Sequence, residues 1–472
     1  MPIRRALGRT ADARAVRAVL SVLLGNFNAD AIAMPIRLPV DHPLRRELAN
    51  EVHARPPVVV PSPAVASTLA LIGAPDGDLL APLRELASRF GVTLDAAPGA
   101  QHVVLQLGEL RVKWERHTEF LSYTFVEPRP GLTLDALSEL PTAFSALPAD
   151  WLASLPGQTI AAVDVVIVPA GSEEPGQEVL ARPYGGQPLV GSEVADGAAW
   201  VFSDFQLTAD GRGRWLVIDW SLKPSQRARL AQRLIEIGVY RVVAMLAFPL
   251  ARASGQRLGA QEQRLSSITG RIAELGDHAA RPLEVEAEER GLLDDLTHLA
   301  AEAERALASG SYRYAGSQAY WDIVIKRVDD LREQRIGGLS TVREFLARRL
   351  EPAMATVAAM ARREQALSAR VARASELLRT RVDVAREEQN QKLLAAMERR
   401  GKLSLRMQQT VEGLSVAALT YYGVGLVGYL AKPLKGLWPA FNPEWAMAAA
   451  VPVLALLVWR GVHRLRSELM RD

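Results

Sequence analysis

The 472-residue sequence contains no cysteine, which excludes disulfide bonds, thiolate metal sites and cysteine nucleophiles. An excess of one charge is also lacking, because the formal net charge is only +3, and this gives little support to a nucleic-acid partner. The seven histidines are scattered without zinc-site spacing, and no phosphate-binding loop, nucleophile elbow or dinucleotide fingerprint occurs. We therefore expect no cofactor and no enzymatic activity, and we leave the metal content open.

Proline is scarce in the second half of the chain. Of the 28 prolines, 22 precede residue 250, and none occurs from Ala353 to Lys432. Because proline breaks helices, this gap permits one helix from Pro352 to Ala431, about 120 Å long. A narrow stripe of apolar residues runs along one face of this predicted helix. To bury the stripe, the helix must pack against neighbouring helices or against copies of itself. The stripe comprises Leu367, Val371, Ala374, Leu378, Val382, Ala385, Gln389, Leu393 and Met397.

The first part of the chain, residues 34–250, has the pattern of a mixed α/β domain. Alternating or continuous apolar runs predict its strands, and helical spacing predicts two helices, Asp78–Phe90 and Ser225–Phe248. Residues 1–33 read as a dispensable extension, with a cleaved signal peptide as the alternative. The expected strands are Ala64–Ile72, His102–Leu107, Arg111–Glu115, Phe120–Val126, Ile160–Val168, and a hairpin of Ala199–Leu207 with Arg214–Ser221.

Two charge-free runs lie near the C-terminus. Gly413–Ala431 has 19 residues and Trp445–Trp459 has 15, which predicts a two-helix transmembrane anchor at residues 413–472. Basic residues flank both runs on the same side, so we expect both termini in the cytoplasm and a bacterial inner-membrane location. Close helix packing within the bilayer is expected at Gly423, Gly425 and Gly428.

Polar clusters in the first part are candidate sites. His42, Glu47, Glu51 and His53 could form a His/carboxylate metal site, although a charged surface helix is the simpler interpretation. Arg116, His117 and Glu119 are expected to continue a strand, so that Glu119 could orient the His117 imidazole. A structural polar ladder is the simpler interpretation there.

Gln389 interrupts the apolar stripe of the long helix. A polar residue on such a seam can fix the register or the oligomeric state, so Gln389 is a candidate contact in a homo-oligomeric coiled coil. The alternative is that its amide simply reaches solvent at the edge of the stripe.

Several segments resemble a family of uncharacterised, membrane-anchored bacterial proteins, domain of unknown function 3422. The resemblance runs from about Leu38 to the end and implies membrane anchoring without any established activity. Its segments are Asp41–Leu48, Asn50–Pro57, Arg116–Phe120, Leu378–Val384, Glu388–Asn390 and Thr410–Ala418.

The architecture also resembles the CorA-type divalent cation channels. Those channels carry Gly-Met-Asn at the outer end of their first span, whereas the corresponding stretch here is Gly428–Lys432. We expect an α+β protein with a helical stalk at residues 251–412 and two transmembrane helices. Its predicted role is a non-catalytic scaffold or sensor on the lipid bilayer, with an unidentified small-molecule or ion ligand. A CorA-like channel and a membrane-surface enzyme are the alternatives.

Overall fold

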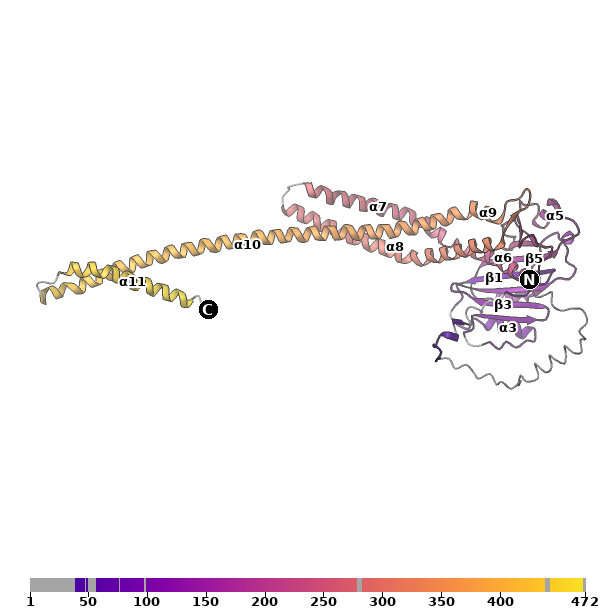
Figure 1. Ribbon diagram of the computed structural model, residues 1–472, viewed down its shortest axis with the longest axis horizontal. Helices are drawn as coiled ribbons and strands as arrows, with labels where there is room; N and C mark the ends of the chain where they lie inside the picture. Colours follow the sequence, from indigo (N-terminus) through magenta and orange to yellow (C-terminus); the bar gives the residue numbers. More distant parts are fainter. Residues whose placement is uncertain are drawn as a thin grey trace, which may run out of the picture. The chain divides into compact units, whose positions relative to one another are not determined.

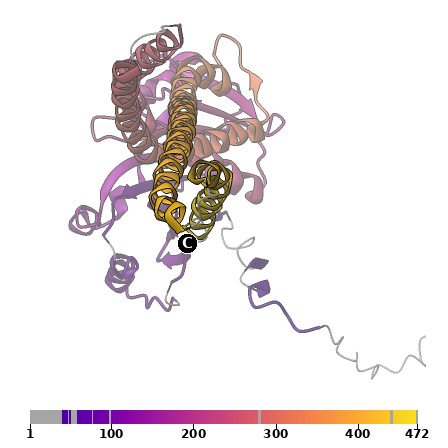
Figure 2. The same cartoon turned by 90° about the vertical axis from the view of Figure 1, so that its left-hand side faces the viewer.

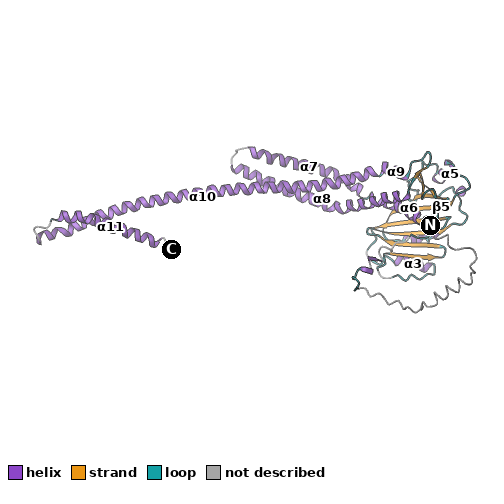
Figure 3. Cartoon of the chain, viewed as in Figure 1, coloured by secondary structure: helices purple, strands orange, loops and turns teal. Residues whose placement is uncertain are grey.

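The computed structural model describes residues 39–46, 48–49, 57–75, 77–96, 99–277, 282–437 and 442–469. The fold is α+β, with a nine-stranded sheet and long helices (Figures 1 and 3). The chain divides into two compact units, each described by itself below. The predicted N-terminal extension, Glu47, Glu51 and His53 lie outside the described residues.

The first unit comprises residues up to Val242 together with Val324–Phe345. Its sheet has the order β2-β3-β4-β1-β5-β8-β7-β6-β9, and only the β5–β8 pair is parallel. The strands are β1 (Ala64–Ile72), β2 (His102–Leu107), β3 (Leu110–Arg116), β4 (Phe120–Pro128), β5 (Gln158–Pro169), β6 (Val190–Val194), β7 (Ala199–Ser203), β8 (Gly213–Asp219) and β9 (Gln334–Arg335).

Strand β5 is longer than its parallel neighbour. Pairing with β8 begins only at Val163, opposite Gly213, and runs to the end of both strands. The other edge of β5 is paired with β1 from Gln158 onwards. Among the described residues, the β5 segment before Val163 therefore has no strand beside it on the β8 side. This free edge of β5 borders the site described below.

Both faces of the central sheet are covered, which is why β1 and β5 are almost continuously apolar. One face packs on the main core, with Trp114, Tyr123, Phe125 and Trp151 among its largest fully buried side chains. On the other face α6 (Pro224–Ala244) approaches β5 at Gly238, where a Cβ would lie 2.8 Å from Val163 Cγ2. Short helices complete the unit: α3 (Ala81–Arg89), α4 (Ala149–Ala153) and α5 (Gln177–Ala181).

The second unit comprises Val243–Ile323 and Leu346–Asp472, and its described elements are helical. They are α7 (Ala247–Asp277), α8 (Pro282–Leu331), whose last turns belong to the first unit, α9 (Val342–Arg349), which also straddles the boundary, α10 (Glu351–Leu437) and α11 (Pro443–Leu469). Helices α7, α8 and α10 share an apolar core that includes Leu265, Leu296 and Val371.

The long helix runs much as its proline-free sequence predicts, over 87 residues. The first half of its apolar stripe, from Leu367 to Leu378, is buried against the other two helices. Beyond Val382 the stripe is largely exposed: Leu393 and Met397 are each 61% exposed, and Gln389 is exposed as well. Among the described residues, the stripe therefore has packing partners in its own chain for only part of its length.

The end of α10 packs against α11 (Figure 2). A Cβ on Gly423 would lie 3.2 Å from Leu454, and one on Gly428 would lie 2.8 Å from the Met447 sulfur, whereas Gly425 has nothing within 4 Å. In the part of the chain that the structure describes, three helical segments could span a membrane by length and composition: Pro224–Leu275, Glu351–Pro433 and Pro443–Arg464. Their most apolar windows are 44%, 11% and 0% buried, respectively.

Candidate ligand-binding site

A buried carboxylate lies beside the free edge of β5. Asp164 is the one charged residue in the apolar run of this strand, and it is fully buried. Its Oδ1 accepts hydrogen bonds from Ser67 Oγ at 2.5 Å and from Thr142 Oγ1 at 2.9 Å. Arg212 Nη1 donates to Oδ2. Ser67 lies in β1, Thr142 precedes a short 3-10 helix, and Arg212 lies in the loop before β8. Asp164 therefore forms hydrogen bonds to three segments that are far apart in the sequence.

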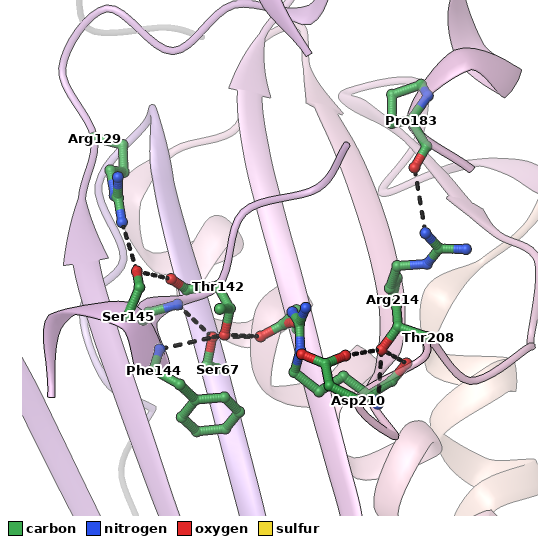
Figure 4. A network of polar contacts seen from close by, with 12 residues as sticks. Ser67, Arg129, Thr142, Phe144, Ser145, Pro183, Thr208, Asp210 and Arg214 are labelled. Atoms are coloured by element: carbon green, nitrogen blue, oxygen red, sulfur yellow. Dashed lines mark hydrogen bonds and ion pairs between the residues drawn. The ribbon is translucent and has the colours of Figure 1, made fainter. Parts of the chain in front are cut away.

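The two hydroxyl groups are fully engaged. Ser67 Oγ accepts from the Ala143 amide at 2.8 Å, and Thr142 Oγ1 accepts from the Phe144 amide at 3.2 Å (Figure 4). Each hydroxyl therefore donates to the carboxylate and accepts from the backbone. Such a cluster orders the sheet and its covering loop, because each hydroxyl is held between the carboxylate and a backbone amide.

Two acids of this cluster, Asp164 and Asp210, both bond to one arginine, Arg212. Burial raises the pKa of Asp164, even though Ser67 and Arg212 act in the opposite direction. Arg212 Nε also donates to Asp210 at 2.7 Å, and this bond holds the pKa of Asp210 below its ordinary value. Thr208 Oγ1 donates to Asp210 (Figure 4) and accepts from the Arg212 amide, and these bonds stabilise the loop that carries Arg212.

Phe205, in the same loop, holds a strained conformation beside a second arginine. Its φ of 55° is unusual for a bulky residue. The Phe205 ring stacks on Phe345 with centroids 4.4 Å apart, and the Arg241 guanidinium lies 5.2 Å from its centroid. Burial lowers the pKa of Arg241. Arg241 makes no ion pair with any described residue, and its buried Nε has no hydrogen-bond partner there.

Of these residues, Thr142, Asp210, Arg212 and Arg241 line a cavity of ≈ 630 Å³ at the start of β5 and β8. This volume lies within the range typical of small-molecule sites, about 300–1,000 Å³. Most of the wall is apolar, and the polar groups are few: Thr142, Thr159, Asp210, Arg212 and Arg241. No histidine is among the described lining residues. The apolar wall includes Leu69, Phe144, Leu152, Ile160, Ala162, Val163, Leu207 and Val242.

Comparison with known proteins places the chain in a family. The profile of the family described as "Protein of unknown function (DUF3422)" matches residues 40–469. The chain belongs to this family. The match covers both units of this DUF3422 protein, including α10 and α11. No curated protein matches the sequence.

The predicted polar clusters of this DUF3422 protein lie elsewhere. His42 is exposed, and its Nδ1 accepts a hydrogen bond from the Leu44 amide at 3.2 Å. The prediction that the strand continues through His117 and Glu119 is wrong, because β3 ends at Arg116 and β4 starts at Phe120. The intervening residues form a turn closed by the His117 amide, which donates to the Phe120 carbonyl at 2.9 Å.

The His117 ring contacts residues of β4. It stacks on Phe120 with ring centroids 4.2 Å apart and lies 3.3 Å from Ser122 Oγ through Nε2. None of the predicted residues His42, Arg116, His117 and Glu119 lines the β5 cavity. The cavity residues were missed because they are scattered in sequence. The one signal nearby was Asp164, a lone acid in an apolar strand, which bonds to the lining residues Thr142 and Arg212.

Proposed function

We propose that this DUF3422 protein is a membrane-anchored, non-catalytic sensor that binds a small molecule in the β5 cavity. The proposal of membrane anchoring is supported by the apolar surface of the α10–α11 pair. Large apolar side chains there are exposed: Tyr421 is 76% exposed, Leu430 67% and Trp445 77%. A soluble protein would bury such a surface, whereas a bilayer covers it.

The third apolar segment, Pro224–Leu275, fits a soluble position better. It includes α6, whose residues Leu234 and Ile237 are fully buried. We therefore assign the two spans to the end of α10 and to α11, with the lipid bilayer as their environment. Basic residues outside both spans favour cytoplasmic termini. These residues are Arg399, Arg400, Lys402 and Arg406 before the first span, and Arg460, Arg464, Arg466 and Arg471 after the second.

A non-catalytic role is supported by the chemistry of the cavity. The Ser67 and Thr142 hydroxyls are committed to Asp164, and Arg212 is committed to two acids. A CorA-like oligomeric channel is the second candidate, favoured by the passage of one long helix into an apolar helix pair. Against magnesium selectivity stands the sequence Gly428–Lys432, which lacks Gly-Met-Asn.

Thiol labelling in intact cells tests the anchoring and its orientation. The chain has no cysteine, so single cysteines report without background. We expect Asn442→Cys, between the spans, to react with a membrane-impermeant maleimide added outside, and Ser467→Cys to react only after lysis. Labelling of Ser467→Cys but not Asn442→Cys in intact cells would reverse the orientation. Protection of both until lysis would argue against a membrane-spanning hairpin.

A further inference from the structure

We propose that the β5 cavity binds an organic carboxylate with an apolar body, and that Arg241 receives its carboxylate group. This inference rests on the proposed binding role of the cavity. It concerns the class of ligand, which follows from the wall of the cavity and from the charges around it.

The acidic groups near the cavity already have cationic partners. Asp164 and Asp210 both bond to Arg212, and Asp204 pairs with Arg214 at 2.5 Å. Arg241 differs, because the described residues offer it no carboxylate at ion-pair distance. Asp204 acts on it only through space. A cation beside an apolar cavity, with its own protein partner missing, attracts an anion.

The surroundings hold the Arg241 guanidinium at the wall of the cavity. Phe205 supports its face through a cation–π contact. Gly213 of β8 lies next to the guanidinium, since a Cβ there would be in ordinary contact with Arg241 Nη2 at 3.8 Å. A guanidinium presents a planar fork of donors that matches the two oxygens of a carboxylate. Since Arg241 is the one unpaired cation among the lining residues, a monoanion fits better than a multiply charged phosphate.

The rest of the cavity fits a hydrocarbon body. Leucine, isoleucine, phenylalanine, valine and alanine side chains make up most of its wall. Burial of each added CH₂ is expected to tighten binding about four-fold until the space is filled. An amphiphile with a carboxylate head is therefore the ligand class that satisfies both parts of the site.

Binding measurements on the full-length protein in lipid nanodiscs test the inference. Octanoate, octanol and octylamine are compared by calorimetry, with empty nanodiscs as the control for uptake into lipid. We expect octanoate to bind at least about ten-fold more tightly than octanol, and octylamine not to bind above the empty-disc signal. Arg241→Gln should abolish the preference for octanoate, and Arg241→Lys should keep part of it.

A second variant keeps the test decisive if Arg241→Gln fails to fold. Leu207 lines the cavity and is 64% exposed, so Leu207→Trp should obstruct the cavity without disturbing the core. We expect this variant to weaken octanoate binding by about ten-fold or more, with Arg241 intact. Val104→Trp is the matched control, because Val104 is 46% exposed and does not line the cavity. It should bind octanoate like the wild type.

The unfavourable outcomes separate the two proposals. If octanol or octylamine binds as tightly as octanoate, and Leu207→Trp removes that binding, the carboxylate inference is wrong while the cavity remains a binding site. If none of the three compounds binds above empty nanodiscs, both the inference and the binding role of the cavity are wrong. Membrane insertion is judged separately, by the labelling of Asn442→Cys.

Discussion

At the scale of single residues, the Asp164 carboxylate determines how the site is held together. It lies fully buried in a strand that is otherwise apolar, and Arg212 is the one cation that bonds to it among the described residues. An ionised carboxylate in such a position is costly unless it is paired and hydrogen-bonded. Asp164 therefore couples the position of the loop before β8 to the centre of the sheet.

Removal of Arg212 should expose that coupling. Arg212→Ala leaves Asp164 buried without its cation, and we expect the free energy of unfolding to fall by about 3–5 kcal/mol. Chemical denaturation followed by circular dichroism measures this change. Arg84→Ala is the control, because the Arg84–Asp78 pair is half exposed and should contribute less than about 1 kcal/mol. Equal losses in the two variants would show that Asp164 does not depend on Arg212.

The helical unit also contains buried acids, of which Glu364 is the least exposed. Glu364 of α10 is 3% exposed, and its Oε2 has no hydrogen-bond partner in the described structure. Tyr314 of α8 donates to Oε1 at 3.3 Å, and Ser254 and Arg257 of α7 face the same side chain. Burial raises the pKa of Glu364 above its ordinary value of 4.5. The folded state therefore holds this proton more tightly than the unfolded state.

The sign of the pH dependence follows from this difference. As the pH rises above 4.5, the unfolded chain loses the proton first, so the Glu364 contribution lowers the free energy of unfolding. Glu364→Gln should therefore raise the melting temperature at pH 7–8, with a gain that shrinks toward pH 4.5. Thermal melts at several pH values check this. The exposed Glu376 provides the control, Glu376→Gln, and a gain independent of pH would contradict the assignment.

At the scale of elements, local sequence predicted those that depend on local rules. Helix α10 follows from an absence of proline, and the β2–β3 hairpin follows from two short apolar runs around Gly108. The turn at His117–Glu119 was missed because its residues are as polar as those of an exposed strand end. Strand β9 was missed because its two residues lie within a helical stretch and pair with β6 only through tertiary structure.

The site was even less accessible to sequence reasoning. Asp164 stands out in its strand, but its partners Ser67, Thr142 and Arg212 are between 22 and 97 positions away. Arg241 occupies an ordinary polar position in the pattern of α6. Its importance becomes visible only when its missing partner and the cavity beside it are known.

The unpartnered half of the α10 stripe leads to a prediction about assembly. Gln389 lies exposed among Leu393, Met397 and other exposed apolar residues, so a second copy of the helix is a suitable partner for this face. Gln389→Leu should raise the melting temperature and broaden the distribution of oligomers. Size-exclusion chromatography with light scattering measures both mass and spread. Gln391→Leu is the control, because Gln391 bonds to Glu387 on another face. If the wild type and both variants have the same melting temperature, mass and spread of oligomers, Gln389 does not lie in a contact between copies of the helix.

At the scale of the whole molecule, the family membership, the two units and the exposed apolar helix pair form one account. The α+β unit carries a cavity suited to a small ligand, and the helical unit ends in the α10–α11 pair, whose large apolar side chains are exposed. We infer that the bilayer covers this pair, and that the protein acts as a sensor held at the membrane.

Extraction of isolated membranes tests this account most directly. Full-length protein and a truncation ending at Arg400 are expressed in parallel, and the membranes are washed with alkaline carbonate and with high salt. We expect the full-length protein to stay in the pellet and to be released only by detergent, because burial of two apolar helices withstands both washes. The truncation should be soluble throughout. Release of the full-length protein by carbonate, or its recovery in the soluble fraction, would contradict the proposal that α10 and α11 anchor the protein in the membrane.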